Sequence, residues 1–258
     1  MISRGGVHDE IATVTLNNPE RLNALNKPTW VRLGEVMHEL SADGSLRCVV
    51  LRGAGDKAFA AGADIAEFAS ERADARQAKI YGNLIHHTMQ AVASCKHPTL
   101  AMIKGACVGG GLEIATCCDM RICGESSRFG VPINKLGLTM GYGELAGLLA
   151  LVGRAVALEI LLEGRVFDAA EALQKRLVNR VVPDDQVEKE AYVTAQRIAD
   201  GAPLVARWHK QFIERLTVRA AIAPQEWDEG FACFDTDDYR EGVTAFLAKR
   251  APRFSAKK

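Results

Sequence analysis

An α/β fold made of repeated ββα units is predicted by two features of the sequence. Short runs rich in β-branched residues alternate with longer runs whose apolar residues recur every three to four positions. The C-terminal part, from residue 186 onward, has a helical pattern except at turns around Pro203, Pro224 and Asp235. Because no low-complexity linker divides the chain, we expect a ββα core at residues 1–195 and a C-terminal helical region at 196–258.

The individual elements follow from the same two patterns. Strands are predicted where β-branched and apolar residues lie between turn formers, at 11–16, 48–53, on both sides of Lys104-Gly105 within 97–110, within 120–132 and at 178–183. Helices are predicted where the period is near 3.6, at 27–41, 112–118, 144–163 and 168–176.

Composition argues against several classes of function. The 258 residues carry 32 basic and 32 acidic side chains, so the formal net charge of zero gives no general attraction to nucleic acid. The N-terminus has no signal-peptide pattern, and no window holds the ~18 apolar residues of a membrane helix. Seven cysteines lie mostly in apolar segments without paired CxxC motifs. We therefore expect reduced, packed thiols, no metal site and a cytoplasmic protein.

A glycine triplet followed by a single acid is the most unusual local feature. In GGGLEIATCC (109–118), Glu113 is the one ionisable acid among apolar residues at the start of a predicted helix. The N–H groups of a helix start can bind a phosphate or an oxyanion, but the spacing matches neither GxGxxG nor GxxxxGK[ST]. By itself the triplet is equally consistent with an oxyanion site and with close strand–helix packing.

A second small-residue turn favours the oxyanion interpretation. In GDKAFAAGADIAEF (55–68), the residues around Gly62 and Ala63 can expose a backbone N–H just before a helix start at Asp64. Two such turns can supply the two donors that hold a thioester oxygen as it becomes an enolate.

The chain resembles the enoyl-CoA hydratase/isomerase, or crotonase, superfamily over residues from about 10 to about 254. The resemblance rests on five motifs in order: LNNPERLNALN (16–26), KAFAAGADI (57–65), GGGLEIATCCD (109–119), FGVP (129–132) and TDDYREGVTAFLAKR (236–250). It implies a crotonase-like spiral of ββα repeats with a C-terminal helical trimerisation region, as a trimer or a dimer of trimers. It also implies an acyl-CoA substrate, with CoA arriving as part of that substrate and no other cofactor.

The resemblance assigns roles to individual residues. The oxyanion donors are the backbone N–H groups of Ala63 and Gly110, and Glu113 matches a catalytic glutamate of the hydratases. Coenzyme A contacts are implied for two groups of residues: Arg21, Leu22, Ala24, Ala61 and Ile65 from the early turns, and Phe234, Phe246, Lys249 and Arg250 from a neighbouring subunit. The alternatives for the last four are core packing for the phenylalanines and a solvated helix face for the basic pair.

The sequence departs from the hydratase pattern at one position. Hydratases usually carry a second glutamate after the proline of an FGxPE-like motif, and here Ile133 occupies that position; Gly141 occupies the position used by some isomerases. Three nearby residues are candidates for the missing partner of Glu113, namely Glu144, Tyr142 and Asn134. Glu144 is equally consistent with a favourable charge in a first helical turn, and Tyr142 with an aromatic that caps the core.

Three functions follow as hypotheses. The first is an enoyl-CoA hydratase, or an isomerase in which a single carboxylate moves the proton. The second is decarboxylation of a malonyl-type CoA in the same oxyanion hole. The third, a non-catalytic or RNA-binding member of the fold, is disfavoured by the neutral charge balance and by Glu113. We expect neither a nucleic acid nor a membrane partner.

Overall fold

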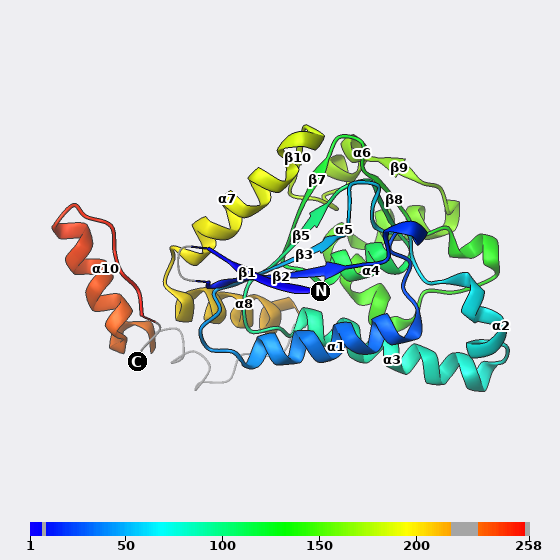
Figure 1. The fold of residues 1–258 in the computed structure, drawn as a ribbon, viewed down its shortest axis with the longest axis horizontal. Helices are drawn as coiled ribbons and strands as arrows, with labels where there is room; N and C mark the ends of the chain where they lie inside the picture. Colours follow the sequence, from blue (N-terminus) through cyan, green and yellow to red (C-terminus); the bar gives the residue numbers. More distant parts are fainter. Residues whose placement is uncertain (7–8, 218–231, 256–258) are drawn as a thin grey trace.

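Two β-sheets packed between helices form the molecule (Figure 1). The computed structural model describes residues 1–6, 9–217 and 232–255, so the turn predicted at Pro224 lies outside the described residues. The larger sheet has the strand order β1-β2-β3-β5-β7-β10 and the smaller sheet has the order β4-β6-β8-β9.

The larger sheet is parallel except at one edge. Its strands are β1 (Ile2–Gly5), β2 (Ile11–Leu16), β3 (Cys48–Gly53), β5 (Thr99–Ile103), β7 (Met120–Gly124) and β10 (Arg180–Val182). Strand β1 pairs antiparallel with β2, whereas β3 is parallel to both β2 and β5, with Val49 opposite Ala12 and Thr99. The strands at 11–16 and 48–53 are confirmed residue for residue.

The smaller sheet receives the second strand of each repeat. Its strands are β4 (Ala58–Ala60), β6 (Ala106–Val108), β8 (Arg128–Gly130) and β9 (Phe167–Asp168). Each repeat places one strand in the larger sheet and the next in the smaller sheet, and a helix then follows: β3-β4-α3, β5-β6-α4 and β7-β8-α5. This arrangement confirms the predicted ββα spiral.

The helices cover both faces of the larger sheet. They are α1 (Lys27–Ala42), α2 (Phe68–Glu71), α3 (Ala75–Ala93), α4 (Gly110–Cys117), α5 (Tyr142–Glu163), α6 (Ala169–Gln174), α7 (Val187–Ala199), α8 (Pro203–Thr217) and α10 (Asp237–Leu247). Short 3-10 turns occur at η1 (Pro19–Arg21), η2 (Ile65–Glu67), η3 (Pro132–Leu136), η4 (Asp184–Gln186) and η5 (Ala232–Asp235).

Alternation along the strands divides the core into two clusters. In β3, Val50 faces α7, while Val49 and Leu51 face the main core, as a period of two requires. Helix α7 covers the first face with Val187 and a row of alanines. The main core lies on the other face, beneath α1, α3 and α4.

Two helices differ from the sequence-based expectation. Helix α3 was not among the predicted helices, although it buries Tyr81, Ile85 and Met89 at helical spacing. Helix α4 begins at Gly110, before the expected Leu112, because the glycines themselves adopt the first helical turn.

Helix α5 alone among the described helices has the length and apolar composition of a membrane span. Arg154 and Glu159 interrupt its apolar run, which is why no uninterrupted window was found in the sequence. Gly153, with φ 71° and ψ 172°, breaks its helical geometry. Neither half therefore has the roughly 20 residues that a straight span requires.

The C-terminal elements lie at one end of the molecule. In Figure 1, α10 is at the opposite end of the long axis from α2. The domain boundary predicted after residue 195 falls within α7 (Val187–Ala199), and the division into two domains stays a prediction.

Gly111 should tolerate no side chain. A Cβ at this position would lie 2.2 Å from the backbone oxygen of Ala60, so Gly111→Ala should cost about 3 kcal/mol of unfolding free energy through overpacking. Gly82→Ala is the matched control, because that Cβ, inside α3, meets open space and should stabilise by about 0.5–1 kcal/mol. Denaturant unfolding measures both, and equal stability of the two variants would contradict this packing.

Candidate active site

Two glycine turns from different repeats meet at the start of α4. Gly62 has φ 104° and Gly109 has φ 52°, and both conformations favour glycine. A Cβ on Gly62 would lie 3.6 Å from the backbone nitrogen of Gly110 and 3.8 Å from Cα of Gly109. The turn that follows β4 and the turn that follows β6 are therefore in backbone contact, as the two motifs suggested.

In each turn, one backbone N–H takes no part in the hydrogen bonds of the neighbouring bridge or helix. Leu25 donates its N–H to the oxygen of Gly62 at 2.8 Å and accepts from the N–H of Asp64 at 2.9 Å. In such a parallel bridge the middle residue, Ala63, points its own N–H to the other side. The first hydrogen bond of α4 runs from Glu113 N to Gly109 O, 2.9 Å, which leaves the N–H of Gly110 outside the helical ladder.

Glu113 is a buried carboxyl in the first turn of α4. Its exposed fraction is 9 %, and its neighbours Leu112, Ile114 and Ala115 belong to the main core. Burial is the main cause that raises its pKa to about 8, and the nearby charge of Glu144 adds to this effect, whereas Arg72 lowers it. A carboxyl with this pKa can hold or release a proton near neutral pH.

Glu144 supplies a second buried carboxyl beside the first. It lies in the first turn of α5 with an exposed fraction of 8 %, and α5 packs against α4, where a Cβ on Gly147 would lie 3.0 Å from Oγ1 of Thr116. The side chain folds back over Gly141, where an added Cβ would lie 2.3 Å from Oε2 of Glu144. Among the residues that the structure describes, neither carboxylate has a hydrogen-bond or ion-pair partner.

Of the three candidates for a partner of Glu113, the structure brings Glu144 into electrostatic range. Asn134 instead donates from Nδ2 to the backbone oxygen of Leu162 at 2.9 Å, at the end of α5. Tyr142 is 95 % exposed, so its phenol is not held in the interior. Ile133 packs on the main core as an ordinary apolar residue.

The five early residues assigned to coenzyme A contacts gather around one pair of loops. The N–H of Ala61 donates to the oxygen of Leu22 at 3.0 Å, and Nη1 of Arg21 pairs with Oδ2 of Asp64 at 2.7 Å. Ala24 lies in the first loop, and Ile65 follows the second with its side chain largely exposed. Asp64 also accepts from the N–H of Ala66 at 3.1 Å, as its predicted N-cap role requires.

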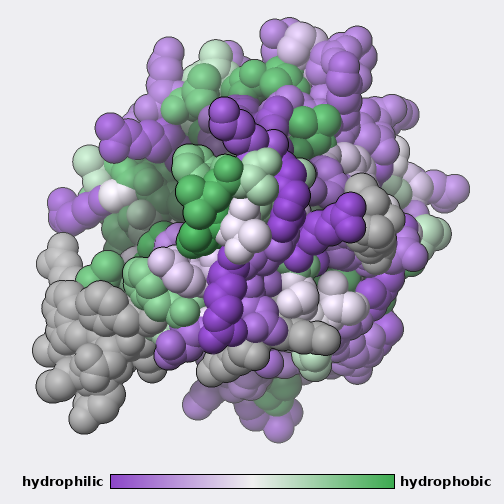
Figure 2. Space-filling model, turned by 90° about the vertical axis from the view of Figure 1, so that its left-hand side faces the viewer, coloured by the Kyte–Doolittle hydropathy of each residue, from purple (hydrophilic) through white to green (hydrophobic). Residues whose placement is uncertain are grey.

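The four C-terminal residues assigned to such contacts lie far from these loops in the same chain. The ring of Phe234 contacts that of Tyr239 in a tilted arrangement with ring centroids 4.8 Å apart, and Phe246 is 83 % exposed. Figure 2 shows this end of the molecule, where apolar side chains (green) lie beside strongly hydrophilic ones (purple). Within one chain, then, Phe234, Phe246, Lys249 and Arg250 do not join the glycine turns (Figure 1).

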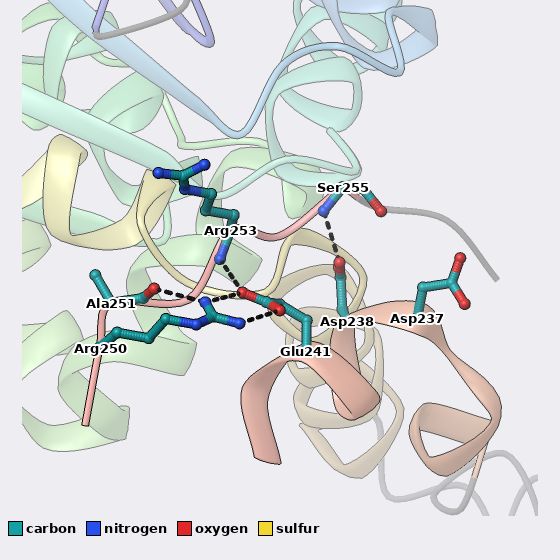
Figure 3. A pocket seen from close by; sticks show the side chains of 7 residues that line it. All are labelled: Asp237, Asp238, Glu241, Arg250, Ala251, Arg253 and Ser255. Atoms are coloured by element: carbon teal, nitrogen blue, oxygen red, sulfur yellow. Dashed lines mark hydrogen bonds and ion pairs between the residues drawn. The ribbon is translucent and has the colours of Figure 1, made fainter. Parts of the chain in front are cut away.

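The C-terminal tail is tied to α10 by a carboxylate. Arg250 donates to both oxygens of Glu241, at 2.6 and 2.9 Å, and the N–H of Arg253 donates to the same carboxylate at 2.8 Å (Figure 3). These donors hold the pKa of Glu241 to about 2. Arg250 is therefore already engaged by Glu241, whereas Lys249 is exposed with φ 53°.

Sequence reasoning missed one charged residue of this region, Arg72. It follows α2 directly, and its positive charge acts on the carboxyl of Glu113. The motif reading stopped at Phe68, and in sequence alone the arginine is one of several charges in SERADAR. The signal that could have found Arg72 is its position between two helices, α2 and α3, neither of which was predicted.

A spiral of ββα repeats, with two glycine turns in contact and a buried pair of acids, is the crotonase-like architecture that the motifs implied. The sequence model of the enoyl-CoA hydratase/isomerase family matches residues 6–257. The chain belongs to this family.

Named relatives and solved structures agree with this assignment. The short-chain-enoyl-CoA hydratase of Clostridium acetobutylicum is 36 % identical over 246 residues, covering 93 % of this chain and 92 % of that protein. The crotonyl-CoA hydratase of Syntrophomonas wolfei is 34 % identical over 252 residues, covering 96 % of each. A crystal structure described as an enoyl-CoA hydratase/carnithine racemase, from Magnetospirillum magneticum, has a TM-score of 0.96 and 54 % identity, covering 99 % of this chain and 95 % of that one.

Proposed function

We propose that the protein is an enoyl-CoA hydratase that adds water across the C2=C3 double bond of a 2-enoyl-CoA thioester. The observation that carries this proposal is the buried pair of Glu113 and Glu144 beside the two glycine turns. Buried carboxyls without partners destabilise the folded state, and they concentrate at catalytic sites. The hydratases among the relatives support the same reaction.

The two glycine turns would bind the thioester oxygen. The N–H groups of Ala63 and Gly110 both face away from regular hydrogen bonding, and Gly62 lies against Gly110. As water attacks C3, the π electrons move toward the carbonyl and leave a negative charge on its oxygen. Preorganised donors at that oxygen stabilise the enolate more than they stabilise the substrate.

The two carboxyls would move the protons. The raised pKa of Glu113 keeps a proton on this acid near neutral pH. Glu144 takes a proton from water while the water oxygen bonds to C3. Glu113 then protonates C2, and proton exchange between the two acids restores the starting state. Glu144 thereby replaces the acid that Ile133 does not provide.

Coenzyme A would bind as part of the substrate, against the loops at 21–25 and 61–65. No other cofactor enters this reaction. The apolar side chains exposed on α10, among them Phe246 and Leu247, suit an interface between subunits, so we propose a homotrimer or a dimer of trimers. Such an assembly would bring Phe234, Phe246, Lys249 and Arg250 to the substrate of a neighbouring subunit. Arg250 would contact that substrate while still paired with Glu241.

The test is a product analysis with three thioesters. The protein should convert crotonyl-CoA to 3-hydroxybutyryl-CoA, identified by mass and NMR. Conversion of a 3-enoyl-CoA to the 2-enoyl isomer without hydration would instead indicate an isomerase. Loss of CO₂ from methylmalonyl-CoA would indicate a decarboxylase, and either result without crotonyl-CoA hydration would overturn the proposal.

Replacing Glu144 by glutamine should lower kcat for hydration by about a hundredfold or more, because the general base is lost. Removal of its charge should also lower the pKa of Glu113, since a like charge no longer opposes ionisation. The alkaline limb of the residual activity should therefore move to lower pH. The measurement is kcat against pH for Glu144→Gln and for the control Glu125→Gln, an exposed site. An unchanged kcat in Glu144→Gln would remove that residue from the mechanism.

A further inference from the structure

Arg72 is a cation with two guanidinium nitrogens that are buried without partners among the described residues. Its guanidinium carbon lies 4.6 Å from the ring centre of Phe68 and 4.0 Å from that of Tyr81. Nε and Nη2 are inaccessible to solvent and have no hydrogen-bond partner among the described residues. The two rings contact the face of the planar group and leave Nε and Nη2 without an acceptor.

The two acids close to Arg72 in the sequence, Glu67 and Glu71, are engaged elsewhere. Glu67 accepts from the hydroxyl of Tyr81 at 3.0 Å and from the N–H of Lys27 at 2.8 Å. Glu71 pairs with Nζ of Lys27 at 2.7 Å. Within the described residues, Arg72 forms no ion pair. A buried guanidinium normally has an anionic partner, because an N–H donor buried without an acceptor destabilises the folded state.

Arg72 lies within electrostatic range of Glu113. It ends the short helix that follows the 61–65 turn, and its charge lowers the pKa of Glu113. With the thioester oxygen at Ala63 and Gly110, and C2 and C3 beside Glu113, the remainder of the acyl group extends past Glu113. Two free guanidinium nitrogens suit a planar carboxylate.

We propose that Arg72 binds a carboxylate at the far end of the acyl group, so that the preferred substrates are CoA monothioesters of short unsaturated dicarboxylic acids. This inference rests on the proposed hydratase function. It makes Arg72 a specificity-determining residue that binds substrate, separate from the residues that move protons.

The test compares two substrates of the same shape. Glutaconyl-CoA ends in a carboxylate, and 5-methylhex-2-enoyl-CoA replaces its two oxygens by methyl groups. The unaltered protein should prefer glutaconyl-CoA by about ten- to a hundredfold in kcat/KM, the range of charge-assisted hydrogen bonds. Arg72→Gln should abolish or invert this ratio, and Arg72→Lys should restore part of it, because lysine keeps the charge without the planar fork.

Arg76→Gln is the matched control, because it removes an exposed arginine from the first turn of α3. It should leave the ratio unchanged. An equal ratio in the unaltered protein and Arg72→Gln, or a preference for the neutral thioester, would overturn the inference.

A binding measurement separates this inference from the proposed reaction. If neither thioester is hydrated, the hydratase proposal fails. Calorimetry with saturated glutaryl-CoA and 5-methylhexanoyl-CoA still decides the role of Arg72. Tighter binding of glutaryl-CoA that is lost in Arg72→Gln supports the inference, whereas equal affinities overturn it.

Discussion

Glu113→Gln should lower kcat for crotonyl-CoA hydration by about 10²- to 10⁴-fold, the usual contribution of a general acid. Glutamine has nearly the same shape, but it cannot deliver a proton to C2. The affinity for an unreactive thioester such as butyryl-CoA should change little, because the amide still fills the same buried space. Steady-state hydration rates and a binding titration measure the two effects separately.

Stability against pH provides the control for this variant. Burial raises the pKa of Glu113 to about 8 from an ordinary 4.5, so between these values the native state keeps a proton that the unfolded chain has released. Unfolding free energy should then fall as pH rises through this window, by up to about 1.4 kcal/mol per pH unit. Glu113→Gln escapes this loss and should be the more stable protein at pH 9, with little difference at pH 4. A variant that is less stable at both pH values would mean that Glu113 has a structural role.

Gly110→Pro should lower kcat by at least about a hundredfold relative to Gly110→Ala, because it removes one of the two proposed oxyanion donors. Proline is tolerated at the first position of a helix, which Gly110 occupies in α4. The preceding Gly109, with ψ −124°, is outside the α conformation that a following proline disfavours. The measurement is kcat and kcat/KM for crotonyl-CoA in both variants.

Gly110→Ala is the matched control because it adds the same Cβ and keeps the N–H. That Cβ would lie 3.0 Å from Cζ2 of Trp30 and 3.3 Å from Cδ1 of Leu25, so both variants share the crowding at Cβ. Thermal unfolding of the pair shows whether both remain folded at the assay temperature. Similar kcat values for folded proline and alanine variants would exclude Gly110 as a donor.

Much of the fold could be predicted from local patterns. The strands at 11–16 and 48–53 are short apolar runs that are almost wholly buried, and the helix at 27–41 buries apolar residues at helical spacing. The sequence records both patterns directly. The helix at 75–93 was overlooked although its apolar spacing is regular. The cytoplasmic location, the trimer or hexamer and the two-domain division stay predictions.

Local sequence patterns predicted only part of the candidate site. Gly62, Gly110 and Glu113 occur in short motifs whose chemistry depends on neighbours in sequence. The contact between the two glycine turns, at 3.6 Å from an added Cβ to a nitrogen, joins segments from successive repeats. The resemblance implied this contact, and the structure gives its geometry.

The sequence by itself determined the ββα order and the family, and it singled out the two glycine turns and Glu113 as parts of a candidate site. These features depend on residues close together in the chain. Only the tertiary structure decided that Glu144, rather than Tyr142 or Asn134, lies buried in electrostatic range of Glu113. It also decided that Arg72 turns inward between two aromatic rings. The physical reason is that burial and charge interaction depend on how α2, α4 and α5 pack, and no local pattern specifies that packing.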